Sequence, residues 1–211
     1  MPAILEQAQT VAIGAFNPYA ITPGWLVKYG ICTRDEEVKV RMVSLGEGAA
    51  FEFGPVQWQV DGQRLSVSSA DRNVDCGQIV SRVLALLPHT PVQAMGHNFQ
   101  FTATKADWGE RPEPRLGRRG LEELESAEQV RWSGIFRKDD ARLEVTLAYE
   151  PGLVAVLFNF HRNMNLEVAS AAPTPEEQIA QARDAATGFR ADFDHSRELL
   201  RSFFEMETSD E

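Results

Sequence analysis

The sequence has few cysteines and no long apolar run. Its two cysteines, Cys32 and Cys76, cannot build the disulfide framework of a small secreted domain. The longest apolar run, Leu153 to Phe158, is far shorter than the ~20 residues that a membrane-spanning helix needs. Residues 1–10 show no basic start followed by an apolar stretch, so no secretory signal is predicted. We therefore expect a cytoplasmic protein with no membrane partner.

The sequence also lacks the familiar motifs of catalysis and nucleotide binding. It contains no P-loop, no Gly-x-Gly-x-x-Gly, no His-Glu-x-x-His and no Gly-x-Ser-x-Gly elbow. Asp192, His195 and Glu198 are spaced three apart, but the further ligands of zinc or di-iron sites are absent, and a charged outer helix face explains them better. We expect no metal and no cofactor. Enzymatic activity stays open, with a non-enzymatic protein favoured.

Basic residues are outnumbered by acidic ones, above all in the second half of the chain. The 21 Lys and Arg residues face 31 Asp and Glu residues, which gives a net charge of −10. Residues 1–105 hold eight basic and nine acidic residues, a net of −1, so residues 106–211 hold thirteen and twenty-two, a net of −9. An acidic surface repels phosphate, and this balance argues against nucleic-acid binding.

Hydrophobic residues make up 43% of the chain and charged residues 25%, as in a soluble globular protein. Periodicity and turn residues predict strands at Gln9–Phe16, Val38–Met42, Phe51–Val60, Leu65–Val67, Val92–Thr104, Val130–Arg137, Arg142–Tyr149 and Leu153–Arg162. The apolar positions change parity after Gly54-Pro55, which predicts a bulge or bend there. Helices are expected after Thr22-Pro23, Asp75 and Thr174-Pro175, with another short one at Leu121–Gln129.

Both halves of the sequence therefore contain a strand meander followed by a helix. This order predicts an α+β fold with antiparallel sheet and a long C-terminal helix. We expect one domain, 1–211, built of an N-terminal half (1–105), a linker loop (106–120) and a C-terminal half (121–211) with a long helix over 175–206.

The C-terminal helix carries an apolar stripe at alternating spacings of three and four. Such a stripe packs across the chain's own sheet, or it forms a seam with the same helix of a second copy. The second alternative predicts a homodimer or another protein partner. The candidate partner-binding residues are Ile179, Ala186, Phe189, Phe193, Leu200 and Phe203.

Four residues are candidates for catalysis. Asn159 and His161 share one face of a predicted strand with Asn163, where amides and an imidazole could position a ligand. A solvent-exposed strand end is the favoured explanation, since the sequence identifies no nucleophile or metal ligand beside them. His97 falls on an apolar strand face and fits a hydrogen-bonded core histidine. Cys76 lies in the first turn of a helix, where the dipole lowers a thiol pKa, but a small buried cysteine is the commoner case.

The segment from Phe193 to Glu205, with its Phe204-Glu205 pair and the acidic end Thr208 to Asp210, resembles the terminal helix of a sporadically distributed, uncharacterised bacterial family. That family's Arg-Tyr-Ile-Asn-like strand motif would fall at Gly96 to Phe99, which here reads Gly-His-Asn-Phe. The family has no established activity that could be carried over. In acidity and layout the chain is also similar to SecB-like export chaperones, which implies an exposed apolar groove.

Three functions remain as hypotheses. The first is a non-enzymatic binding or accessory protein that forms a homodimer. The second is a small hydrolase or transferase that uses His161 and Asn159, and the third is a SecB-like holdase chaperone. The sequence does not name a small-molecule ligand.

Overall fold

The computed structural model describes residues 2–33, 38–44, 48–104, 130–150, 153–164, 174–204 and 206–208. Ten strands are found there: β1 (Pro2–Gly14), β2 (Val38–Ser44), β3 (Gly48–Phe53), β4 (Val56–Val60), β5 (Arg64–Ser69), β6 (Val92–Thr104), β7 (Val130–Lys138), β8 (Ala141–Glu150), β9 (Leu153–Asn163) and β10 (Glu207–Thr208). The helices are α1 (Pro23–Lys28), α2 (Cys76–Ala85), α4 (Pro175–Thr187) and α5 (Phe189–Phe204).

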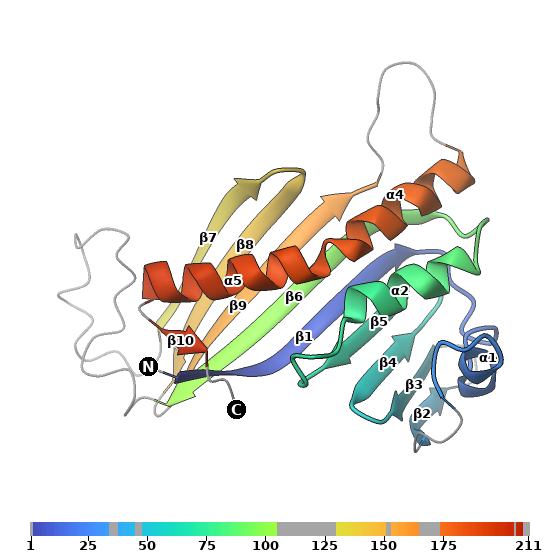
Figure 1. Cartoon of the computed structure of the whole chain (residues 1–211), viewed down its shortest axis with the longest axis horizontal. Helices are drawn as coiled ribbons and strands as arrows, with labels where there is room; N and C mark the ends of the chain where they lie inside the picture. The colour runs from blue at the N-terminus through green and yellow to red at the C-terminus, as the bar shows by residue number, and fades with distance from the viewer. Residues whose placement is uncertain are drawn as a thin grey trace.

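All ten strands belong to one sheet, in the order β2-β3-β4-β5-β1-β6-β9-β8-β7 (Figure 1). The pairs along this order are antiparallel, and β10 adds to β1 in parallel. The two long strands β1 and β6 pair at the centre, with β2–β5 on the β1 side and β7–β9 on the β6 side. The predicted α+β fold, with its antiparallel sheet and C-terminal helix, is confirmed.

Helices α2, α4 and α5 lie against one face of the sheet (Figure 1). The core between them is aromatic: the Phe99 ring of β6 lies 5.1 Å from that of Phe189 and 5.4 Å from that of Phe193, both on α5. Alternation along β6 therefore places one set of side chains under the helices and the other set on the opposite face. We call this second face, which α2, α4 and α5 do not cover, the open face.

The expected helix over 175–206 is two helices, because the chain leaves the α-helical hydrogen-bonding pattern at Gly188, between α4 and α5. Glycine is the poorest helix former after proline, which explains the position of the break. The predicted capping box at Thr174 is confirmed: the Thr174 side chain accepts from the Glu177 N–H, and the Glu177 carboxylate accepts from the Thr174 N–H.

The apolar stripe of α4 and α5 faces the chain's own sheet. Five of the six candidate partner-binding residues are buried there, and Phe203 is half-buried. The five are Ile179, Ala186, Phe189, Phe193 and Leu200. Their burial within one chain means that they need no second copy to be covered. The homodimer stays a prediction.

The parity change at Gly54-Pro55 is a hairpin turn, so the prediction of one bent strand was wrong. Phe53 pairs with Val56 and Phe51 with Trp58, which returns the apolar side chains to the same face of the sheet. Gly54 has a φ of +50°, which glycine adopts without steric cost. At the N-terminus the first strand begins at Pro2 rather than at Gln9.

Two predicted segments, the linker 106–120 and the short helix 121–129, lie outside the described residues. None of the helices in the part of the chain that the structure describes is long and apolar enough to cross a membrane.

Candidate functional site

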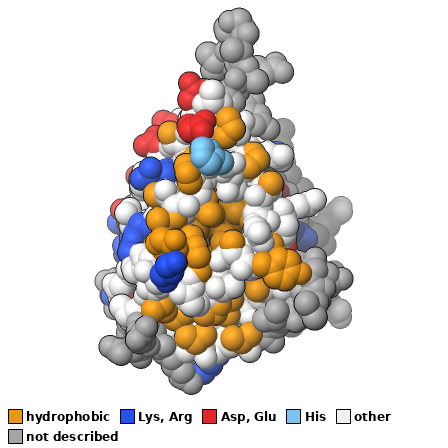
Figure 2. Space-filling view, turned by 90° about the vertical axis from the view of Figure 1, so that its right-hand side faces the viewer, with side chains coloured by type: hydrophobic (Ala, Val, Ile, Leu, Met, Phe, Trp, Pro, Cys, Tyr) orange, Lys and Arg blue, Asp and Glu red, His pale blue; other side chains and the backbone are white. Residues whose placement is uncertain are grey.

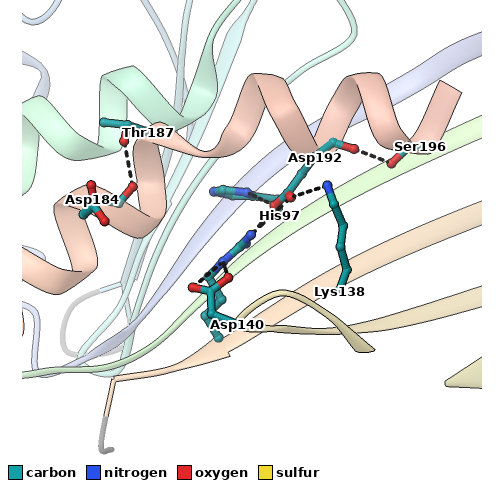
Figure 3. A network of polar contacts seen from close by, with 8 residues as sticks. His97, Lys138, Asp140, Asp184, Thr187, Asp192 and Ser196 are labelled. Carbon is teal, nitrogen blue, oxygen red and sulfur yellow. Dashed lines mark hydrogen bonds and ion pairs between the residues drawn. The ribbon is translucent and has the colours of Figure 1, made fainter. Parts of the chain in front are cut away.

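A cluster of charged side chains is buried between α5 and the sheet (Figure 3). Asp192 of α5 is only 1% exposed and points inward. Its Oδ2 accepts from Nδ1 of His97 on β6 at 2.8 Å and from the Arg162 guanidinium on β9 at 2.7 Å, and its Oδ1 accepts from the same guanidinium at 3.1 Å. The Asp192 carboxylate therefore links α5 to β6 and β9 by hydrogen bonds.

Two further groups complete the cluster. Asp140, in the turn between β7 and β8, accepts from Nε of Arg162 at 3.0 Å, and Nζ of Lys138 on β7 lies 3.7 Å from Oδ1 of Asp192. The two carboxylates and two cations balance one another. Such pairing allows the charges of Asp192 and Arg162 to be buried, whereas the Asp140 side chain is 66% exposed at the edge of the cluster.

Burial and pairing act in opposite directions on the titration of this cluster. Burial would raise the pKa of Asp192, but hydrogen bonds from His97 and Arg162 outweigh it and hold that pKa below its usual value. Burial lowers the pKa of His97, and the bond to Asp192 does not restore it. His97 is therefore a neutral imidazole that donates from Nδ1, and its Nε2 carries the lone pair.

The position of His97 argues against catalysis. Its Nε2 has no hydrogen-bond partner among the described residues, and the same is true of Oγ1 of Thr10, directly opposite on β1. The imidazole pairs with a carboxylate as a catalytic base would. However, the His97 side chain is fully buried beneath α5, and its ring packs at 5.5 Å against that of Phe189. A substrate has no access, so the histidine has a structural role.

Asn159 and His161 lie on the open face, as their predicted strand position requires. Asn159 pairs across strands with Asn98, whose side-chain amide donates to Oε1 of Gln9 at 2.9 Å. Nε2 of His161 lies 3.0 Å from Oδ1 of Asn163. These polar side chains lie side by side on a sheet surface. Within the described residues, no group of three or more His, Cys, Asp and Glu could hold a metal ion.

Cys76 is the first residue of α2 and is fully buried. Burial raises the pKa of its thiol to about 12, and the neighbouring Asp75 carboxylate acts in the same direction. This outweighs the helix dipole that the sequence suggested would lower it. The thiol lies 3.6 Å from the carbonyl oxygen of Ala8, to which it donates. A thiol in this state is not a nucleophile near neutral pH.

An apolar pocket of about 260 Å³ opens between α5 and the end of the sheet formed by β7, β8 and β9. Arg137, Lys138 and His195 are its ionisable residues. The apolar lining residues are Trp132, Phe136, Leu143, Val145, Phe158, Leu199, Phe203 and Phe204. We call this the α5 pocket.

Gly134 shapes one wall of the α5 pocket. A Cβ at this position would lie 2.7 Å from Cη2 of Trp132 and 2.9 Å from Cε2 of Phe136. The absence of a side chain therefore lets the two aromatic rings close over the strand. Phe136 remains 38% exposed, although its strand is paired with β8 along its whole length. Lys138, which lines the pocket, connects it to the buried cluster through Asp192.

A second apolar surface lies at the opposite end of the sheet, around α1 (Figure 2). Tyr19, Tyr29, Val38 and Val40 are exposed there. The hollow beside them has a volume of about 620 Å³ and is lined in part by Val27 and Phe53. This hollow is more open to solvent than the α5 pocket.

Sequence reasoning missed both the α5 pocket and the role of Asp192. The alternation of Trp132, Gly134 and Phe136 on one strand face was available as a signal, but nothing in it identified a helix opposite. Asp192 was assigned to a charged outer face, which is wrong, because its carboxylate points inward. Its spacing of three from Phe189 places it beside the apolar stripe and was a usable signal.

A comparison with protein-family models found no match, and a comparison with curated protein sequences found none either. The resemblance to an uncharacterised bacterial family and the similarity to SecB-like chaperones stay predictions. The α5 pocket is the feature of the structure that best indicates a function.

Proposed function

We propose that this chain is a non-enzymatic binding protein that holds an apolar segment of a partner protein in the α5 pocket. The observation that carries the proposal is the exposed Phe136 at the mouth of a pocket whose walls are aromatic and aliphatic. Pockets of this kind receive one or two large side chains, and aromatic anchors supply much of the affinity of protein interfaces.

The candidates for catalysis support a binding role over an enzymatic one. His97 and Cys76 are fully buried, and His161 lies on a sheet face beside amides. A hydrolase or transferase that used His161 and Asn159 would need a nucleophile or an activated water at that surface. None of the contacts described for these two residues supplies one.

The test uses peptides displayed on phage, twelve residues long and random in sequence, selected on the full-length protein. We expect enriched peptides with paired aromatic or aliphatic residues. The Phe136→Ser variant should weaken their binding by at least about tenfold, since it removes an anchor ring from the pocket. Leu86→Ser is the matched control, because Leu86 is 37% exposed and lies at the end of α2, away from the pocket.

Failure to enrich any peptide, or equal binding by both variants, would refute the pocket as the binding site. A SecB-like holdase remains the second candidate, and the apolar surface around α1 favours it. A holdase would bind unfolded chains of many sequences. It would lose that binding on Val40→Ser, in β2, and keep it on Phe136→Ser.

A further inference from the structure

We propose that the partner segment binds as an added β-strand along the outer edge of β7, and that it alternates apolar and acidic residues. This rests on the proposed function and deepens it, since it names the conformation and the chemistry of what enters the α5 pocket. Three independent features of β7 carry the inference: its open edge, the two different faces of its side chains, and its charge.

The outer edge of β7 is unpaired within the described part of the chain. β7 pairs with β8 over nine residues without a register shift, and no other described strand adjoins it. A strand edge presents a row of free N–H and C=O groups, which is a template for another extended chain. Addition of a strand to such an edge is a recurring mode of peptide recognition.

The hairpin turn fixes which backbone groups point outward. Lys138 pairs with Ala141 across the two-residue turn Asp139-Asp140, so this closing pair exchanges hydrogen bonds. Hydrogen-bonded and non-bonded pairs then alternate along the ladder. The N–H and C=O groups that point away from β8 are those of Arg131, Ser133, Ile135 and Arg137.

The side chains of β7 divide between the two faces. Trp132, Phe136 and Lys138 line the α5 pocket. By alternation Arg131, Ile135 and Arg137 belong to the open face, although Arg137, next to the turn, also contributes to the lining of the pocket. The side chains of a strand added along β7 would also alternate between the α5 pocket and the open face. Its apolar residues would lie beside Trp132 and Phe136, and the residues between them would lie beside the two arginines.

Charge selects an acidic partner. β7 carries Arg131, Arg137 and Lys138 and no acidic residue, in a protein with a net charge of −10. Lys138 is paired with Asp192, whereas neither arginine has an ion pair within the described residues. Arg137 also stands directly opposite Arg142 of β8. Like charges in this position repel each other, although Arg142 is also paired with Glu144 on its own strand at 3.9 Å. A carboxylate on an added strand would lie on the other side of Arg137 and would give this arginine an opposite charge.

The same arginines disfavour a second copy of the chain as the occupant. Antiparallel pairing of two β7 strands about Gly134 places Arg131 of each opposite Arg137 of the other. Two like-charged pairs then face each other across the junction. Carboxylates at those two positions of a different chain would form opposite-charge pairs instead. The edge is therefore assigned to an acidic segment of another protein.

The probe is a blocked, fluorescently labelled peptide, Glu-Phe-Glu-Leu-Glu-Phe-Glu, and binding to the full-length protein is followed by fluorescence anisotropy. Its control has lysine in place of every glutamate. We expect the glutamate peptide to bind at least about tenfold more tightly, with a difference that shrinks as salt rises. In the double variant Arg131→Glu, Arg137→Glu, the preference between the two peptides should reverse.

Ile135→Pro tests strand addition. The substitution removes one outward N–H and spares the ladder to β8, and proline is tolerated at such positions of edge strands. Ile135→Ala gives the effect of losing the side chain alone. We expect Ile135→Pro to bind the glutamate peptide at least about fivefold more weakly than Ile135→Ala. Circular dichroism checks that both variants are folded, and the charge-reversal variant tests the proposal independently.

Several outcomes would overturn the inference. Equal affinity for both peptides would exclude the acidic partner, and equal binding by the proline and alanine variants would exclude strand addition. A dimer seen by light scattering and abolished by Ile135→Pro would assign the edge to a second copy. Loss of binding in Phe136→Ser without an effect of the edge variants would leave the pocket standing and remove only the added strand.

Discussion

At the scale of single residues, Asp192 has the largest consequences. It lies on a helix whose neighbouring positions are polar, yet its carboxylate receives hydrogen bonds from His97 and Arg162 and lies near Lys138. Of the two groups that donate to it, the His97 side chain has no other hydrogen-bond partner among the described residues, and Arg162 has only Asp140 as a second carboxylate partner there. A buried ion pair adds little stability compared with an apolar contact, but removal of one member leaves the others uncompensated.

The variant Asp192→Ala should therefore lose about 3–5 kcal/mol of unfolding free energy, because it leaves the Arg162 guanidinium buried without its main partner. Urea denaturation, followed by circular dichroism, measures the change. Asp194→Ala is the matched control, since Asp194 is exposed on the same helix, and its effect should stay within about 0.5 kcal/mol. Similar losses in both variants would mean that the cluster contributes no more than a surface charge.

At the scale of elements, α2 packs closely against the junction of α4 with α5. Gly77, in the first turn of α2, has no side chain, and a Cβ there would overlap the carbonyl oxygen of Ala186 and Cβ of Phe189. The helix start therefore lies directly against the opposing backbone. This contact holds α2 at the place where the two C-terminal helices meet.

The variant Gly77→Ala should destabilise the protein by about 1–3 kcal/mol, because the overlap is with backbone, which cannot rotate aside. Gly24→Ala is its counterpart in the first turn of α1, where nothing lies within 4 Å of the added atom. There the higher helix propensity of alanine should be neutral or add up to about 1 kcal/mol. Thermal unfolding of both variants measures the difference, and a stable Gly77→Ala protein would contradict the close approach.

The elements differ in how far the sequence predicts them. Period-two alternation located β6 at the residues that the structure gives, and Thr174 with Glu177 located the start of α4. A local pattern fails where two structures produce the same spacing of apolar residues. The parity change at Gly54-Pro55 fits either a bent strand or a hairpin, and only the pairing of Phe51 with Trp58 decides between the two. The α5 pocket could not be predicted, because its walls are residues far apart in the chain.

The candidate site shows the same limit. The strand position of His161 and Asn159 followed from alternation, but their neighbours Asn98 and Gln9 follow only from the strand order. The burial of Asp192 depends on Arg162 and His97 reaching the same point from two strands. A sequence shows which residues can form ion pairs, whereas long-range register decides which of them meet.

At the scale of the whole molecule, the sheet is arranged around the central pair β1–β6, and its two ends differ. At the β2 end, Phe51 and Trp58 are buried on the same face of the sheet as His97, and exposed apolar residues lie near α1 and on β2. At the β7 end, the α5 pocket opens beside an unpaired basic edge within the described residues. The half of the chain with a net charge of −9 thus carries an edge strand, β7, that has three basic residues and no acidic one.

Acid should destabilise the whole molecule through His97. The folded state holds this imidazole neutral, with its pKa below the ordinary value of 6.5, in the company of Asp192 on α5, Arg162 on β9 and Asp75 before α2. Below about pH 6.5, His97 therefore binds a proton in the unfolded chain but not in the folded chain. The free energy of unfolding then falls by up to about 1.4 kcal/mol for each unit by which the pH decreases. The lowered pKa of Asp192 keeps its own contribution intact until the pH falls below 3.8.

The net charge of −10 acts in the opposite direction, since protonation in mild acid reduces self-repulsion. The variant His97→Gln separates the two effects, because glutamine can still donate to Asp192 but does not titrate. Urea unfolding from about pH 7.5 to about pH 5.5 should show the wild-type protein losing about 1.4 kcal/mol more than the variant. Parallel pH profiles would mean that His97 takes up its proton without unfolding and that the cluster tolerates a charged imidazole.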